Sequence, residues 1–153
     1  MPREVEVHIT VVICTWNRCE LLRQTLEQMT RLVIPPRVRW SVVVVDNNST
    51  DDTATVIESF GGCLPIRRVF EPTPGQSHAR NAGLREAEGD FILWTDDDVL
   101  LNSDWLVAFF EATERHPEGA VFGGPCEPWF PVKPLESVPL VQEPCINNST
   151  TLK

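Results

Sequence analysis

Three consecutive carboxylates at residues 96–98 follow the apolar run 91–94 after a single threonine. Adjacent anions repel one another, and no Lys or Arg stands near them in the sequence to relieve that repulsion. Side chains two positions apart in an extended segment point to the same side, so Asp96 and Asp98 can share one ligand while Asp97 faces elsewhere. Because carboxylate and phosphate oxygens are ligands for divalent cations, this spacing predicts a D-x-D metal site that holds a phosphorylated ligand. A solvated acidic loop is the alternative.

Another polar stretch, residues 46–53, also begins where an apolar run ends. Its first residue, Asp46, is a carboxylate able to accept a hydrogen bond from a base N–H such as N3 of uracil. The same residues suit a turn at the end of a strand followed by a helix cap, since Ser49 and Asp52 have capping side chains. Both interpretations stay open on the residues alone.

A third stretch, residues 76–83, predicts the start of a helix. The N-terminus of a helix attracts anions, and Arg80 adds a full positive charge suited to a diphosphate. An ordinary surface arginine is the alternative. Three small residues, Ala79, Ala82 and Gly83, would let this helix lie close to a sheet.

These stretches are joined by an alternation of apolar runs and amphipathic segments. Apolar and β-branched runs predict strands at residues 8–14, 40–45, 66–70, 91–94 and 120–122. Helical spacing predicts helices at residues 19–29, 51–60, 76–87 and 104–115, with Ser49 or Thr50 capping the second and Ser103 the last. This order predicts an α/β fold of Rossmann type, with a mostly parallel sheet and helices on both faces.

The polar stretches are expected to meet at one edge of that sheet. Ligands of parallel α/β sheets bind at the carboxyl ends of the strands. Residues 15–18, 46–49 and 96–98 all come directly after predicted strands, so a binding site is predicted there. The candidate residues from the first two stretches are Thr15, Asn17, Arg18, Asp46, Asn48 and Ser49.

Composition narrows the class of protein. A chain of 153 residues suits one domain with a core, and a net charge of −9 argues against nucleic acid as a partner. Five cysteines without a C-x-x-C pair and three scattered histidines give no zinc or disulfide pattern. No signal peptide is recognisable, and no apolar run approaches the roughly 20 residues of a transmembrane helix. We expect a cytoplasmic protein, with membrane association as an open alternative.

The composition changes after Gly124. Six prolines fall between residues 125 and 144, which predicts irregular structure. We therefore divide the chain into a folded part, residues 1–124, and a proline-rich irregular tail, residues 125–153.

Four ordered blocks of the sequence resemble the family 2 glycosyltransferases, the large inverting group with the GT-A fold. The first block, residues 11–18, is similar to the family's "vsviiptyNr". The second, residues 46–53, follows D-x-x-S-x-D-x-T, and the third, residues 75–83, follows G-x-x-x-A-R-N-x-G. The fourth is the acidic segment 95–98. The resemblance covers roughly residues 8–124 and implies a GT-A fold.

The resemblance implies a nucleotide-diphosphate sugar as donor, with a UDP-sugar as the first expectation, and a saccharide or lipid-linked acceptor. It implies that Thr15 and Asp46 contact the base and ribose, and that Arg80 lies near the base or diphosphate. Asp96 and Asp98 match the two acids that serve Mn²⁺ or Mg²⁺ and the donor's phosphates and ribose. The other expected donor-binding residues are Asn17, Arg18, Asn48, Ser49, Asn81 and Asp97.

The family also uses a carboxylate base, which deprotonates the acceptor hydroxyl that attacks the anomeric carbon in line. That base lies well after the D-x-D, and this sequence continues only 55 residues past Asp98. Glu127, Glu136 and Glu143 do not match the family's base motif. We therefore expect the donor-binding half of a metal-dependent inverting transferase, truncated before the acceptor-binding half, with the catalytic base beyond Lys153.

Two other functions stay open at this point. The chain could bind a nucleotide-sugar without performing any transfer. A flavodoxin-like signalling receiver also carries acids at strand ends, but it requires a pair of acids after its first strand, where this chain has Thr-Trp-Asn-Arg at residues 15–18.

Overall fold

The computed structural model describes residues 6–130. Its contacts divide the chain into two units, Met1–Pro117 and Glu118–Lys153. The described part of the second unit, residues 118–130, contains no helix or strand. The strand predicted at residues 120–122 is therefore wrong, because the apolar stretch is three residues long, glycines flank it and the Val121 side chain is exposed. The rest of the predicted tail, with Glu136 and Glu143, lies outside the described residues.

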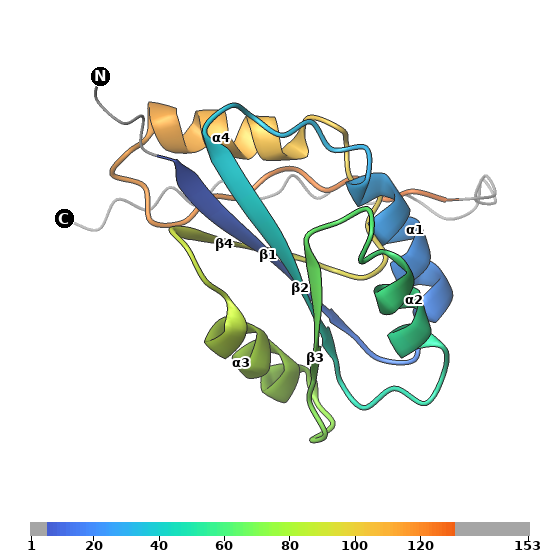
Figure 1. The fold of residues 1–153 in the computed structure, drawn as a ribbon. Coiled ribbons are helices and arrows are strands. Elements are labelled where there is room, and N and C mark those ends of the chain that lie inside the picture. Colours follow the sequence, from blue (N-terminus) through green and yellow to red (C-terminus); the bar gives the residue numbers. More distant parts are fainter. Residues whose placement is uncertain (1–5, 131–153) are drawn as a thin grey trace, which may run out of the picture. The chain divides into compact units, whose positions relative to one another are not determined.

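The first unit is built on a four-stranded sheet (Figure 1). Its strands are β1 (Val7–Thr15), β2 (Val38–Asp46), β3 (Ile66–Phe70) and β4 (Phe91–Thr95). They lie in the order β3-β2-β1-β4, and each neighbouring pair is parallel. The four valines at 42–45 are all buried, since both faces of this part of the sheet are covered. The predicted parallel α/β fold is confirmed.

Four helices cover the two faces of the sheet (Figure 1). They are α1 (Cys19–Met29), α2 (Thr53–Ser59), α3 (Gln76–Glu86) and α4 (Trp105–Arg115). Leu22, Ile57 and Leu106, from α1, α2 and α4, join one core cluster on one face. Ala79 and Ala82 of α3 join a second cluster on the other face. None of the helices within residues 6–130 has the length and apolar character needed to cross a bilayer.

Helix α3 lies very close to the sheet. Its buried residues, Ala79, Ala82 and Gly83, are all small. A methyl group added at Gly83 would lie 2.6 Å from Cγ1 of Val12 and 3.3 Å from Cγ2 of Val45. The close approach predicted from these small residues is therefore present, and it brings the N-terminus of α3 to the carboxyl edge of the sheet.

The helix caps predicted from Ser49, Thr50 and Ser103 are wrong. The residues directly before α2 and α4 are Asp52 and Asp104, and neither side chain makes a capping hydrogen bond. The predicted caps lie two to four residues ahead of the first helical residue, whereas the capping position is the residue directly before it.

Candidate functional site

The strand order reverses beside β1, which is where parallel sheets bind ligands. Strand β1 has β2 on one side and β4 on the other. The register pairs Ile13 with Thr95, so that Thr15, at the end of β1, comes beside Asp97 in the loop after β4. The Thr15 hydroxyl donates a hydrogen bond of 2.7 Å to the Asp97 carboxylate. The expected meeting of strand ends is therefore present at this edge.

A cavity of about 670 Å³ opens at the same edge. Its volume lies in the range of ligand pockets, about 300–1,000 Å³. Six of the predicted site residues line it: Thr15, Arg18, Arg80, Asp96, Asp97 and Asp98. Further side chains in its wall include Cys14, Trp16, Asn47 and Trp94.

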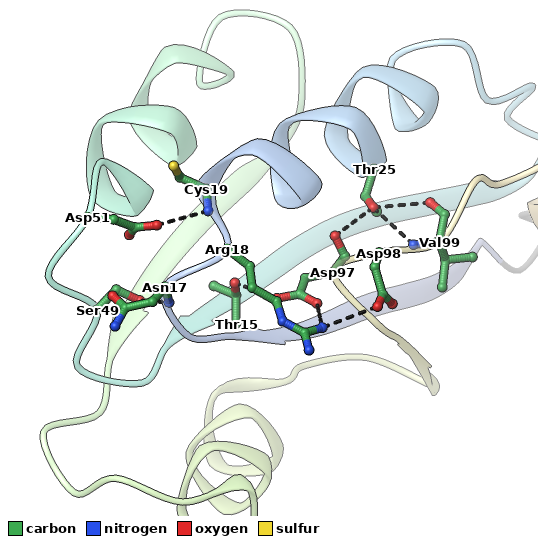
Figure 2. Close-up of polar contacts among 10 residues, drawn as sticks. All are labelled: Thr15, Asn17, Arg18, Cys19, Thr25, Ser49, Asp51, Asp97, Asp98 and Val99. Carbon is green, nitrogen blue, oxygen red and sulfur yellow. Dashed lines mark hydrogen bonds and ion pairs between the residues drawn. The ribbon is translucent and has the colours of Figure 1, made fainter. Parts of the chain in front are cut away.

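The acidic loop divides into one buried and two exposed side chains. Asp97 is only 5% exposed, whereas Asp96 and Asp98 are exposed. Thr25 of α1 holds the loop in place: its hydroxyl donates a 2.9 Å hydrogen bond to the Asp97 carbonyl and accepts one of 3.2 Å from the Val99 N–H (Figure 2). Burial therefore alternates along the loop, but the expectation that Asp97 faces elsewhere is wrong, because Asp97 lines the same cavity as Asp96 and Asp98.

A cation does relieve two of the three acids, contrary to the expectation from the sequence. Nη1 of Arg18 lies 3.3 Å from Oδ1 of Asp97 and 3.2 Å from Oδ2 of Asp98 (Figure 2). Inspection of the nearby sequence could not find this contact, because 79 residues separate Arg18 from Asp97. The parallel pairing of β1 with β4 brings the loops after the two strands together.

Two of these carboxylates fit a divalent cation that is bound together with a ligand. No group of three metal-ligating side chains is found within residues 6–130. Asp97 already accepts hydrogen bonds at both carboxylate oxygens, which leaves Asp96 and Asp98 as the protein ligands at this cavity. Mg²⁺ sites of this kind are completed by substrate phosphates and water. The donor set therefore suits an ion shared between the protein and a phosphorylated ligand.

Asp46 ends β2, but it does not line the cavity. Its carboxylate is fully buried, and both oxygens are used within the protein. Oδ2 accepts hydrogen bonds of 2.6 and 3.0 Å from the Arg68 guanidinium, and Oδ1 accepts one of 2.9 Å from the Ser49 N–H. In this state Asp46 supports the loop after β2 and has no free oxygen for a ligand.

Asn47, the next residue, lines the cavity instead. Its amide nitrogen donates to the carbonyls of Glu71 and Thr73, at 3.1 and 2.7 Å. Its amide oxygen accepts a 2.8 Å hydrogen bond from the Gly75 N–H. Asn47 thereby fixes the loop that leads into α3 and sets where that helix begins.

Asn17 and Ser49 join the loops that follow β1 and β2 (Figure 2). The Asn17 N–H donates a 3.0 Å hydrogen bond to the Ser49 hydroxyl, and the Thr50 N–H donates one of 2.7 Å to Oδ1 of Asn17. Asn17 adopts a left-handed backbone, with φ of 52°. Asn17 and Ser49 do not line the cavity, and neither do Asn48 and Asn81, whose side chains are exposed.

Asp51 holds the first turns of two helices. Its carboxylate accepts hydrogen bonds from the Cys19 N–H of α1 at 3.0 Å and from the N–H and hydroxyl of Thr53 in α2 at 3.1 and 2.5 Å. Burial alone would raise the pKa of Asp51, but the hydrogen bonds from Thr53 and Cys19 outweigh it and lower the pKa to about 2. This contact fixes the backbone on the C-terminal side of Arg18.

Arg80 and Cys14 lie at the wall of the cavity, one exposed and one half-buried. Burial raises the pKa of the Cys14 thiol to about 11; the positive charge of Arg80 opposes this shift, and the negative charges of Asp96 and Asp97 add to it. A thiol in that state is a poor nucleophile at neutral pH. The wall therefore supports binding of a ligand and not attack by a cysteine.

A second cavity, of about 320 Å³, lies near the amino ends of the strands. Its wall includes His8 and Thr10 of β1 and Arg39 and Ser41 of β2. These side chains bond mainly to one another: Arg39 to His8, His8 to Ser41, and Ser41 to Thr10, at 3.1–3.3 Å. Since ligands of parallel sheets bind at the opposite edge, the larger cavity is the stronger candidate.

Several residues of the site were missed by reasoning from the sequence. Asn47 could have been chosen over Asp46 from strand alternation, which turns neighbouring side chains to opposite faces. Trp16 is 60% exposed and Trp94 is 44% exposed, and an exposed indole beside a polar cavity marks a binding surface. Thr25 gave no signal, because its contact with the acidic loop depends on how α1 packs.

The comparisons with known proteins agree with this geometry. The family model described as Glycosyl transferase family 2 matches residues 10–127. The succinoglycan biosynthesis protein ExoM of Rhizobium meliloti (strain 1021) is 34% identical over 125 residues, which cover 80% of this chain and 40% of ExoM. The chain thus spans less than half the length of this relative.

Two solved structures share the fold. The structure of S. aureus TarS 1-349 in complex with UDP-GlcNAc has a TM-score of 0.64 at 28% identity, covering 71% of this chain and 32% of that one. The mannosyltransferase PcManGT from Pyrobaculum calidifontis, in complex with GDP-Man and Mn²⁺, has a TM-score of 0.57 at 31% identity, covering 63% and 29%. With its family match, its parallel sheet and its cavity at the strand ends, this chain belongs to glycosyl transferase family 2.

Proposed function

We propose that the cavity binds a nucleotide-diphosphate sugar, and that the chain is the donor-binding part of an enzyme that transfers the sugar to an acceptor hydroxyl with inversion. One observation carries this proposal: the carboxylates of Asp96 and Asp98 and the guanidinium of Arg80 line a single cavity at the carboxyl edge of the sheet. The complexes of TarS with UDP-GlcNAc and of PcManGT with GDP-Man support this class of ligand. A UDP-sugar is the donor that we expect.

Charge explains how an acidic protein would hold a diphosphate. The chain carries a net charge of −9, so binding needs positive charge that is placed locally. Arg80 and the N-terminal N–H groups of α3 supply part of it at the cavity. Asp96 and Asp98 would hold Mn²⁺ or Mg²⁺, and when bound such an ion neutralises charge on the diphosphate and on the leaving group.

The nucleoside would lie against Thr15 and the two indoles of the cavity. Trp16 and Trp94 offer flat apolar faces on which a base can stack. The remaining predicted residues would act on the shape of the loops: Asp46, Asn17 and Ser49 hold the strand ends in place. Asn48 and Asn81 are both exposed, so they would contact the sugar donor only if that ligand extends beyond the cavity wall.

Residues 1–124 would form the donor-binding part, and residues 125–153 would begin the acceptor-binding part. ExoM is much longer than this chain, which leaves room in such relatives for an acceptor site and for the base that takes the hydroxyl proton. We place the catalytic base outside this sequence and expect a saccharide or lipid-linked acceptor. Free thiols such as Cys63 and Cys126 suit the cytoplasm. A lipid-linked acceptor would bring the enzyme to a membrane surface.

A donor-binding chain without turnover is the second candidate. It is favoured by the absence, within residues 6–130, of a carboxylate that matches a catalytic base. Release of free sugar or UDP from a UDP-sugar, compared with an Asp96→Asn plus Asp98→Asn variant, separates the two candidates. Turnover above that variant supports an active enzyme. A signalling receiver is set aside, because the chain belongs to another family.

Calorimetric titration with UDP tests the binding site. UDP is added to the protein with Mn²⁺ and then with EDTA, and removal of the metal is expected to weaken binding by about tenfold or more, roughly 1.4 kcal/mol. The Asp96→Asn plus Asp98→Asn variant is expected to remove this difference. A control with the same change of charge, Asp52→Asn plus Asp104→Asn, alters exposed residues outside the cavity and is expected to keep it.

Two results would overturn parts of the proposal. If UDP binds equally well with EDTA and in the double variant, the assignment of a metal to Asp96 and Asp98 is wrong. GDP is titrated in the same way as UDP. If neither nucleotide binds with Mn²⁺ or with EDTA, the cavity is not a nucleotide site.

A further inference from the structure

Arg18 already pairs with one of the two carboxylates that we propose as metal ligands. A single nitrogen, Nη1, bridges the two carboxylates of Asp97 and Asp98, at 3.3 and 3.2 Å (Figure 2). Of these, Asp98 is one of the two proposed metal ligands, whereas Asp97 is buried and also holds the Thr15 hydroxyl. The acidic loop therefore has an internal counter-cation before any metal arrives.

The two ion pairs differ in how easily they can be broken. The Arg18 side chain is 53% exposed and that of Asp98 is 46% exposed, while that of Asp97 is only 6% exposed. Water screens the pair with Asp98 much more than the pair with Asp97. A divalent ion that takes Asp98 therefore displaces Arg18 from the weaker of its two contacts.

The backbone beside Arg18 is fixed, so that its side chain is the part that can move. Asn17 on one side is held by Ser49 and Thr50, and Cys19 on the other side is held by Asp51. The Arg18 side chain also lines the cavity proposed for the diphosphate. A guanidinium leaving Asp98 consequently stays within the site, where phosphate oxygens are its natural partners.

We propose that Arg18 makes metal binding depend on the nucleotide. Without ligand, Arg18 competes with the divalent ion for Asp98. When a diphosphate arrives, its oxygens take over Arg18 and free Asp98 for the ion, so that each of the two ligands strengthens the binding of the other. This inference rests on the proposed function and adds to it an order of events: the ion binds weakly alone and tightly with the nucleotide.

Titration of Mn²⁺ in the absence of nucleotide tests this directly. Free Mn²⁺ is measured by electron paramagnetic resonance with the unaltered chain and with Arg18→Gln, Arg18→Lys and Arg23→Gln. Arg18→Gln is expected to bind Mn²⁺ alone roughly two- to fivefold more tightly, as expected for loss of a screened competing ion pair. Arg18→Lys keeps the charge and is expected to stay near the unaltered chain.

Arg23→Gln is the matched control. Arg23 lies in α1, which begins directly after Arg18, and it pairs with Glu20 at 3.6 Å, outside the cavity. The same loss of charge is therefore expected to leave Mn²⁺ affinity unchanged. The second measurement is coupling: saturating UDP is expected to tighten Mn²⁺ binding strongly in the unaltered chain and less so in Arg18→Gln. Thermal unfolding of each variant, measured alongside, identifies any variant that fails to fold.

The outcomes separate this inference from the proposed function. If UDP and Mn²⁺ bind together but Arg18→Gln binds Mn²⁺ alone no better than Arg23→Gln does, Arg18 is not a competitor and the inference fails while the proposed function stands. If saturating UDP tightens Mn²⁺ binding equally in the unaltered chain and in Arg18→Gln, the inference also fails while the proposed function stands. If neither UDP nor Mn²⁺ binds the unaltered chain, both fail together. If Arg18→Gln does not fold, Arg18→Ala and Arg18→Lys carry the comparison, and a Mn²⁺ affinity equal in these two variants overturns the inference.

Discussion

The carboxylate of Asp46 is fully buried at the end of β2, and its ion pair with Arg68 offsets the free-energy cost of burying the charge. Their side chains meet from the neighbouring strands β2 and β3, with Nη2 of Arg68 at 2.6 Å from Oδ2 of Asp46. A buried charge that loses its partner costs much more than an exposed one, because it has no water to replace the partner. The pair is thus a structural element of the loop that carries Asn47 into the cavity.

Arg68→Gln is expected to lower the free energy of unfolding by about 2–3 kcal/mol, below the usual cost for a buried pair because Arg68 itself is 32% exposed. Its neighbour Arg67 is the control. It pairs with Glu86 at the surface, and Arg67→Gln is expected to cost less than about 1 kcal/mol. Urea unfolding measures both. Equal losses in the two variants would contradict a structural role for the Asp46–Arg68 pair.

The distance between α3 and the sheet is set by Gly83. This helix carries Arg80, and its first residue, Gln76, also lines the cavity, so its position decides the position of the proposed anion site. Val12 and Val45, the side chains nearest to a methyl group at Gly83, are both fully buried and belong to the core under α3. A larger residue at this position must push the helix away from the sheet.

Gly83→Ala is therefore expected to destabilise the protein by about 1–2 kcal/mol, since overpacking exceeds the gain of about 1 kcal/mol in helix propensity. Gly62→Ala serves as the control, because nothing lies within 4 Å of a methyl group placed there. Its effect is expected to stay within about 0.5 kcal/mol. Thermal or urea unfolding measures the two variants, and a neutral Gly83→Ala would mean that the helix lies further from the sheet.

The contact between the N-termini of α1 and α2 depends on the negative charge of Asp51. The pKa of Asp51 in the folded protein, about 2, lies below the ordinary value of 3.8. A lowered pKa means that the stabilisation is fully present above about pH 4 and is lost as the pH falls towards 2. Titration of the Asp51 side-chain carbon by nuclear magnetic resonance is expected to give a midpoint near 2. A midpoint near 4 would show that the contacts with Cys19 and Thr53 do not hold the carboxylate in solution.

The helices and strands were largely predictable because each one follows a single local pattern. Helix α1 begins and ends as the sequence predicted, since its apolar positions repeat at helical spacing and polar residues bound it. Strand β3 also has the predicted ends, with Pro65 before it and Glu71 after it. The helix caps were not predicted correctly, because a serine or threonine hydroxyl has several possible hydrogen-bond partners. The strand at residues 120–122 was also wrong, because three apolar residues bury too little surface to define a strand.

The site was predictable as a place and less so in its contacts. Polar residues after β1, β2 and β4 had to meet once the strands were parallel. The pairing of Arg18 with Asp97 and Asp98 joins side chains that are far apart in the sequence. That Asn47 lines the cavity and Asp46 does not depends on the direction in which each side chain points. No local pattern encodes either of them.

At the scale of the whole molecule, the account places one ligand site at the carboxyl edge of the sheet and none at the amino edge. An acidic chain can bind a diphosphate only where cations gather, and the larger cavity combines Arg18, Arg80, the start of α3 and the two proposed metal ligands. The smaller cavity has arginines too, but its polar groups already bond to one another. The two edges therefore give opposite expectations for a nucleotide.

Mapping of backbone amide shifts on addition of UDP and Mg²⁺ tests this most directly. The resonances of Trp16, Gly75, Arg80 and Asp97, at the larger cavity, are expected to shift, while those of His8 and Ser41, at the smaller cavity, stay unchanged. Shifts confined to the amino edge, or spread evenly over both edges, would contradict the placement of the nucleotide at the ends of β1 and β4.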